Sequence, residues 1–237
     1  MTDLAPVLPW LFAVGAVAVV VGGFLLEQKR RERVMLFARN RGWRFVAEDP
    51  LLVDRWDGDP FGKGERRRAR HVLTGVENGR PFTAFDYSYV TRSTDSKGHT
   101  STTTHRFGVC AVPLPTPLGT VEVRSEDLFT RAAGAAGLLS SIDLESEDFN
   151  RRFRVLASDR KLASDVLTPR TMHFLIAAQP AAWRLQGGHI LSWHPGRLEP
   201  AEVVRTCAVL GRVLDGIPSF VWKDAGARPV SGYDPQP

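Results

Sequence analysis

The sequence predicts an α+β protein in which an N-terminal transmembrane helix precedes a mainly antiparallel sheet domain packed by C-terminal helices. Three features favour this class. Residues 9–26 are apolar and uncharged, as a membrane span requires. The pair Asn78-Gly79 is a strong tight-turn signal, and strands joined by tight turns are antiparallel. The clearest helical periodicity comes late, over residues 200–215.

The run at residues 9–26, PWLFAVGAVAVVVGGFLL, is long enough to cross a bilayer. At ~1.5 Å per residue it spans about 27 Å as a helix, close to the ~30 Å of a hydrocarbon core. Trp10 stands at one end, where interfacial aromatic residues are common. A cleaved signal peptide is the alternative, but residues 1–8 lack positive charge and no A-x-A site follows the run.

Charge sets the orientation of the predicted span. No basic residue precedes it, and four follow it at once: Lys29, Arg30, Arg31 and Arg33. Since positive flanks stay in the cytoplasm, we expect a single-pass protein of the cell membrane with residues 1–8 outside and the C-terminal domain in the cytoplasm. The same four residues are candidates for contact with an anionic lipid surface.

The remaining boundaries follow from helix and turn signals. Residues 27–42 read as a basic juxtamembrane helix closed by Gly42. Residues 43–222 read as one cytoplasmic α+β domain. The segment 223–237 has the composition of a disordered tail.

Strands are expected first in the domain. Residues 43–47 alternate like a strand, and the turn-rich segment 48–68 ends in a basic loop. A type I′ turn at Asn78-Gly79 would place His71 opposite Asp86. Further along the chain we expect a Ser/Thr-rich connection at 91–104, a strand at 103–112 that three prolines end, and a strand at 120–124.

Helices gather in the second half. They are expected at 125–136, after Ser158, from Thr168-Pro169 onward and at 200–215. A short strand is expected at 142–145, and a second hairpin at 183–193 around Gly187-Gly188.

Two segments carry a family resemblance: 145–170, ESEDFNRRFRVLASDRKLASDVLTPR, and 78–89, NGRPFTAFDYSY. They resemble a family of uncharacterised bacterial proteins, frequent in actinobacteria, that have an N-terminal membrane segment. The resemblance extends over residues 30–222 and implies membrane attachment and a single domain. It implies no activity and no catalytic residue.

The weak catalytic candidates are His71 and Asp86, because a histidine oriented by a carboxylate can act as a general base. No serine or cysteine nucleophile is identifiably placed beside them, so a structural hydrogen bond is the competing interpretation. His189 and His194 would point to opposite faces of a strand, and no metal or cofactor motif is present. We therefore expect no metal and no cofactor.

The Ser/Thr-rich segment offers hydroxyl groups for modification. We hypothesise that a kinase phosphorylates one or more of its threonines, Thr94, Thr100, Thr102, Thr103 and Thr104. The two cysteines, Cys110 and Cys207, are expected to be small buried residues in a reducing compartment. A net charge of +5 is weak evidence for nucleic-acid binding and suits an anionic membrane as well.

The leading functional interpretation is a membrane-anchored cytoplasmic binding or scaffolding module that interacts with a protein partner or an anionic lipid. One alternative is a membrane-tethered enzyme, such as a hydrolase that uses His71 and Asp86. Another is an envelope protein held as a homodimer by the small-xxx-small pair Ala18 and Gly22.

Overall fold

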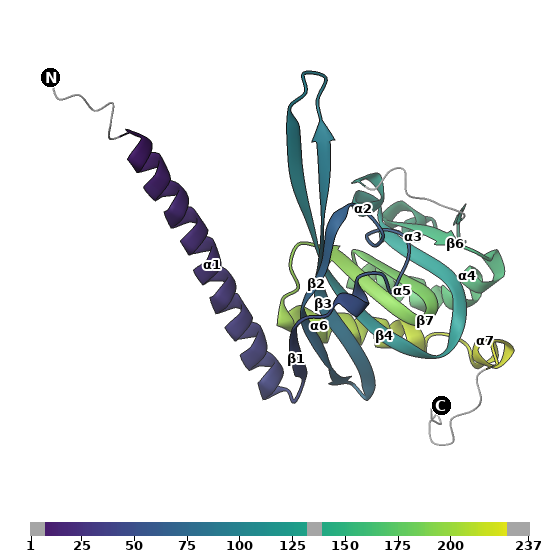
Figure 1. The fold of residues 1–237 in the computed structure, drawn as a ribbon. Helices are drawn as coiled ribbons and strands as arrows, with labels where there is room; N and C mark the ends of the chain where they lie inside the picture. The colour runs from purple at the N-terminus through teal and green to yellow at the C-terminus, as the bar shows by residue number, and fades with distance from the viewer. Residues whose placement is uncertain (1–7, 132–138, 227–237) are drawn as a thin grey trace.

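One antiparallel sheet of seven strands dominates the part of the chain that the structure describes (Figure 1). The structure is a computed structural model that describes the backbone of residues 8–131 and 139–226, and the side chains of 21–128 and 139–226. The strands are β1 (Arg44–Glu48), β2 (Glu65–Glu77), β3 (Arg80–Thr94), β4 (Thr100–Ser125), β5 (Ser140–Ile142), β6 (Phe153–Ala157) and β7 (Ala182–Pro195). Their order is β1-β2-β3-β4-β6-β5, with β7 also paired to β4.

Most of the helices follow β4 in the sequence. The helices are α1 (Leu8–Asn40), α2 (Glu126–Arg131), α3 (Glu147–Arg152), α4 (Arg160–Val166), α5 (Pro169–Ala178), α6 (Pro200–Asp215), α7 (Ser219–Asp224) and the 3₁₀ turn η1 (Pro50–Leu52). The predicted α+β class, with a large antiparallel sheet and C-terminal helices, is therefore confirmed.

Helix α1 is continuous from Leu8 to Asn40, so the segment 27–42 that was predicted as a juxtamembrane helix is not a separate element but lies at the end of α1 (Figure 1). It ends in a Schellman motif: Trp43 N–H donates to the Ala38 carbonyl at 2.8 Å, and Gly42 takes a φ of 69°. This confirms the predicted role of Gly42.

No helix among the described residues combines the length and apolar character that crossing a bilayer requires. The predicted span at 9–26 falls mostly on residues whose side chains lie outside the described set, and it stays a prediction.

The β2–β3 hairpin confirms the turn prediction. Asn78 and Gly79 both take positive φ, 50° and 75°, as a type I′ turn requires. The predicted register holds from Glu77↔Arg80 back to Leu73↔Ala84. Beyond that point the prediction is wrong: a register shift between Arg70 and Leu73 puts Arg70, not His71, opposite Asp86.

Three predicted boundaries in the first half of the domain are wrong. Residues 65–68, expected in a basic loop, open β2. The Ser/Thr-rich segment forms strand, since β3 continues to Thr94 and β4 begins at Thr100. The prolines at 113–117 do not end β4, because the strand changes register there and pairs again with β7 from Leu118.

The second predicted hairpin is also wrong, because residues 183–193 lie in one continuous strand, β7, paired to β4. Gly187 takes a φ of 56° at the irregularity in this pairing. Helix α6 begins and ends as predicted, and Thr168 caps α5 as predicted. Asp159, not Ser158, caps α4, since the Ser158 hydroxyl is bonded to the Thr120 backbone.

The ends of two predicted segments lie outside the described residues. The helix expected at 125–136 is described only as α2, and residues 132–138 are not described. Of the predicted tail 223–237, residues 223–226 belong to the end of α7 and its turn, and 227–237 are not described.

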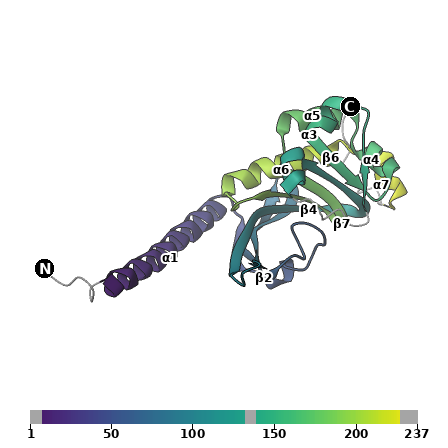
Figure 2. The ribbon, with the colours of Figure 1, turned by 90° about the horizontal axis from the view of Figure 1, so that it is seen from above.

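Different elements cover the two faces of the sheet (Figure 2). On one face, Val203, Cys207 and Leu210 of α6 are buried in the larger apolar core. On the other face, the irregular segment 49–64 packs Trp56 and Phe61 into a second core that contains several aromatic side chains. The sheet is therefore buried on both sides, although only one side carries long helices.

Candidate functional site

The structure brings the His71 and Asp86 side chains together, as the sequence suggested. His71 Nδ1 lies 2.9 Å from Asp86 Oδ2. The register shift in β2 makes this contact possible, since His71 takes a φ of 49° in a bulge and its ring reaches the partner strand.

A third side chain completes the group, and it comes from α1. Arg30 donates to both carboxylate oxygens of Asp86, at 2.6 and 3.2 Å, and to the Leu198 carbonyl at 2.7 Å. Its Nη1 also lies 3.0 Å from His71 Nδ1. The Leu198 N–H donates to Asp86 at 2.7 Å. We call these four residues the Arg30 junction.

The Arg30 junction is buried and electrostatically matched. Arg30 is 5% exposed and His71 6% exposed. Burial opposes ionisation of Asp86, but the hydrogen bonds from His71, Arg30 and the Leu198 backbone together lower the pKa of this carboxyl. At the rim, Glu27 forms an ion pair with Arg197 at 2.7 Å and lies 3.6 Å from His71 Nε2.

These contacts favour a structural role for His71 and Asp86. A hydrolytic His–Asp pair needs the second ring nitrogen turned to a nucleophile. Here Nε2 faces the Glu27 carboxylate, and within residues 21–128 and 139–226 no serine, threonine or cysteine is hydrogen-bonded to His71. The His71 and Asp86 side chains instead hold α1 against β2, β3 and the chain that enters α6.

The basic flank of the predicted span divides into two groups. Lys29, Arg31 and Arg33 are exposed and remain candidates for a lipid surface. The prediction for Arg30 is wrong, because its guanidinium is buried in the domain. Arg30, Val34 and Ala38 recur every four residues on one stripe of the helix, and all three are buried.

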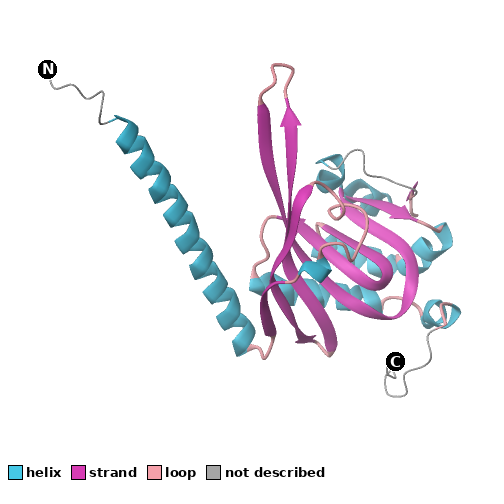
Figure 3. Cartoon of the chain, in the orientation of Figure 1, coloured by secondary structure: helices cyan, strands magenta, loops and turns pink. Residues whose placement is uncertain are grey.

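The Ser/Thr-rich segment forms a two-stranded arm that projects beyond the sheet (Figure 3). Its pairs run from Thr91↔Thr103 to Thr94↔Thr100, and an Asp95–Gly98 turn closes it. Asp95 accepts hydrogen bonds from the Lys97 and His99 N–H groups, which rigidifies the turn. All five candidate threonines are exposed, so a kinase could reach them, and phosphorylation stays a prediction.

A buried charge cluster, which was not predicted from the sequence, lies under the segment 49–64. Arg124 bonds Asp59 at 3.0 Å and also bonds Glu122. Arg184 bonds Glu122 at 3.1 Å, and both guanidinium groups lie over the Trp193 ring. The charged residues alternate with apolar ones along β4 and β7, a pattern that is equally typical of a strand with one solvated face. They instead tie the segment 49–64 to the sheet through Asp59.

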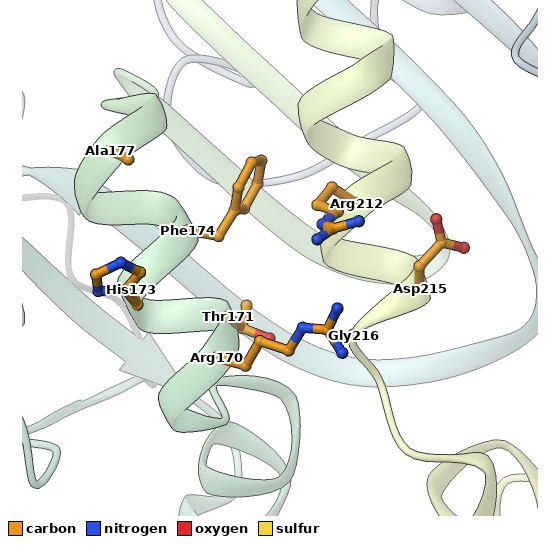
Figure 4. A pocket seen from close by; sticks show the side chains of 8 residues that line it. All are labelled: Arg170, Thr171, His173, Phe174, Ala177, Arg212, Asp215 and Gly216. Carbon is orange, nitrogen blue, oxygen red and sulfur yellow. The ribbon is translucent and has the colours of Figure 1, made fainter. Parts of the chain in front are cut away.

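A cleft of about 480 Å³ opens between α5 and α6 (Figure 4). The polar and charged side chains of its lining are Arg170, Thr171, His173, Arg212 and Asp215, and its other lining residues are Phe174, Ala177 and Gly216. Sequence reasoning did not single out this cleft, because its two sides lie some forty residues apart in the chain.

No protein-family model matches the sequence, and no curated protein matches it. Among solved structures, the fold is similar to the crystal structure of the mycobacterial trehalose monomycolate transport factor A, with a TM-score of 0.57. The sequence identity is 16%, and the match covers 80% of this chain and 95% of that one. The similarity shows a shared fold, and its mycobacterial source agrees with the resemblance to actinobacterial proteins.

Proposed function

We propose that this protein is a membrane-attached, non-enzymatic accessory factor that holds a binding domain on the cytoplasmic side and assists lipid transport by binding a partner protein. The observation that carries the proposal is the burial of Arg30 of α1 inside the domain. A helix joined to its domain in this way sets the position of the domain relative to whatever the helix enters.

Two further observations support the proposal. The contacts that hold α1 also occupy His71 and Asp86, the residues on which the hydrolase alternative depends. The similar fold belongs to a protein that is named a trehalose monomycolate transport factor, and this favours a role in lipid transport over other roles of an anchored scaffold.

The test is a gene deletion complemented with the full chain and with two single variants, Arg30→Ala and Arg31→Ala. We expect the full chain to fractionate with membranes and to restore delivery of envelope lipids to the cell surface. Arg30→Ala should fail to restore delivery, whereas Arg31→Ala, which removes an exposed charge from the same helix turn, should restore it.

Proximity labelling from a tag at the C-terminus completes the test. Reproducible enrichment of a few cytoplasmic or membrane-embedded proteins is the expected result and would identify the partner. Labelling of exported proteins would overturn the topology. Turnover of a substrate by the purified full chain, abolished by His71→Ala, would overturn the non-enzymatic assignment.

A further inference from the structure

The cleft between α5 and α6 holds two arginines that make no ion pair with the described part of the chain. Arg170 comes from the first turn of α5 and Arg212 from the last turn of α6. Their guanidinium groups point into the same space (Figure 4). Neither makes a hydrogen bond or an ion pair with any residue that the structure describes. Both arginines are exposed, so solvent weakens their mutual repulsion, and an anion between them would attract both charges.

The acid in the lining does not supply that anion. Asp215 directs its carboxylate to Arg80, with Oδ1 2.5 Å from Arg80 Nη2. Figure 4 shows this carboxylate turned away from Arg170. Because Asp215 is paired with Arg80, the positive charges of Arg170 and Arg212 are in excess among the described residues that line the cleft.

The rest of the cleft suits an organic group beside the anion. Phe174 and Ala177 give one wall an apolar surface. The chain at Gly216 approaches α5 closely, since a Cβ there would lie 2.7 Å from Thr171 Oγ1, and this approach closes the base of the cleft. A volume of about 480 Å³ is within the range of small-molecule sites and exceeds the needs of a bare phosphate.

We propose that this cleft binds an organic phosphate, with Arg170 and Arg212 directed at the phosphate oxygens and Phe174 against the organic part. A planar guanidinium fork matches two phosphate oxygens, and a phosphate dianion balances the excess charge of the two arginines. The site lies at the far end of α6 from Leu198, so it is separate from the Arg30 junction and does not depend on the proposed transport function.

The test is isothermal titration of the full chain in an uncharged detergent at about 0.15 M salt, where exposed, isolated charges are largely screened. The probes are inorganic phosphate, glycerol 3-phosphate and dioctanoyl phosphatidic acid. We expect saturable binding that is at least tenfold weaker in the double variant Arg170→Ala, Arg212→Ala. The matched control, Arg160→Ala with Arg205→Ala, removes two exposed arginines outside the cleft and should bind as the wild type does.

The probes separate two sources of the same chemistry. Cleft-dependent binding of glycerol 3-phosphate supports the site with a soluble ligand, and cleft-dependent binding of phosphatidic acid alone supports it with a lipid headgroup. Absence of binding to every probe, or equal losses in the two double variants, overturns the proposal. Full affinity in the double variant Arg170→Lys, Arg212→Lys also overturns the proposal, because it would show that the cleft binds through positive charge alone and not through guanidinium geometry. Unchanged thermal melting of each variant confirms that it is folded.

Discussion

Arg30 stands in the run EQKRRER, and the other basic residues of that run are exposed. What distinguishes it is its place on the stripe that continues through Val34 and Ala38 towards the sheet. A buried guanidinium needs partners for its donors, and here two carboxylate oxygens and a backbone carbonyl accept from it. The residue therefore contributes to stability through groups that belong to two separate segments, β3 and the chain that enters α6.

We expect Arg30→Ala to destabilise the full chain by about 2 to 3 kcal/mol, because Asp86 would keep its charge in a buried place without its main counter-ion. Denaturant unfolding in an uncharged detergent measures this loss. Arg31→Ala is the control, since Arg31 is exposed, and it should change stability by less than about 0.5 kcal/mol. Equal effects of the two variants would contradict the role assigned to Arg30.

Asp86 should make stability depend on acid pH. Its pKa in the folded protein is lowered below the ordinary value by His71, Arg30 and the Leu198 backbone, and Glu27 lies 3.6 Å from the other ring nitrogen of His71. A carboxyl group whose pKa is lower in the folded state stabilises the fold at pH values above its unfolded pKa, about 4. This stabilisation is lost as the pH falls through the pKa of the folded state. Wild type should therefore lose more stability than Asp86→Asn between about pH 5 and pH 3.

Unfolding midpoints measured across that range, with Asp57→Asn as the control, check the prediction. Asp57 is exposed and makes no ion pair with the described residues, so its variant should follow the wild-type profile. A wild-type curve parallel to that of Asp86→Asn would count against an ionised Asp86 in the junction.

At the scale of elements, the sequence predicted what local chemistry decides. The Asn78-Gly79 turn, the Gly42 helix end, the Thr168 cap and the whole of α6 depend on residues within a few positions of one another. The continuity of β4 and β7 depends on pairing between distant segments, which overrides their prolines and glycines.

The candidate site shows the same division. The contact between His71 and Asp86 could be predicted because both lie in one hairpin, whereas Arg30 is 56 residues from Asp86 in the chain. The buried pair Glu122 and Arg184 could not be predicted, since alternation with apolar neighbours also describes a strand with one face in water. Residues 49–64 cover that face, and their sequence has no regular alternation of apolar and polar residues.

The arm formed by β3 and β4 should be dispensable for folding. Its side chains from Arg92 to Thr104 are exposed, and none belongs to either apolar core. Replacing residues 92–102 with Asn-Gly should therefore change the free energy of unfolding by less than about 0.5 kcal/mol. A larger loss in denaturant unfolding would mean that the arm stabilises the domain through contacts with the rest of the chain.

For the whole molecule, the two cysteines can report the compartment. Cys110 on β4 and Cys207 on α6 are both buried, and their sulfur atoms lie 3.6 Å apart, against about 2.05 Å in a disulfide. The hydrogen bond to Cys207, together with burial, raises the pKa of the Cys110 thiol well above its usual range, so the thiolate that reacts is scarce.

We expect both thiols to be free in a chain whose domain faces the cytoplasm. Oxidised glutathione should then join them slowly in the purified chain, accepting the two electrons and two protons that the thiols lose. The state of the two thiols in cells is measured by alkylation at the moment of lysis, followed by peptide mass spectrometry. A disulfide already present in freshly lysed cells would contradict the cytoplasmic placement.

The Arg30 junction also has a mechanical consequence. Because the guanidinium is bonded to β3 and to the chain entering α6, α1 is free neither to swivel about its own axis nor to slide along it unless those bonds break. A force applied to α1 would act on Asp86 and on Leu198, which lies just before α6. A torque applied to the helix would therefore be transmitted to the sheet and to α6 together.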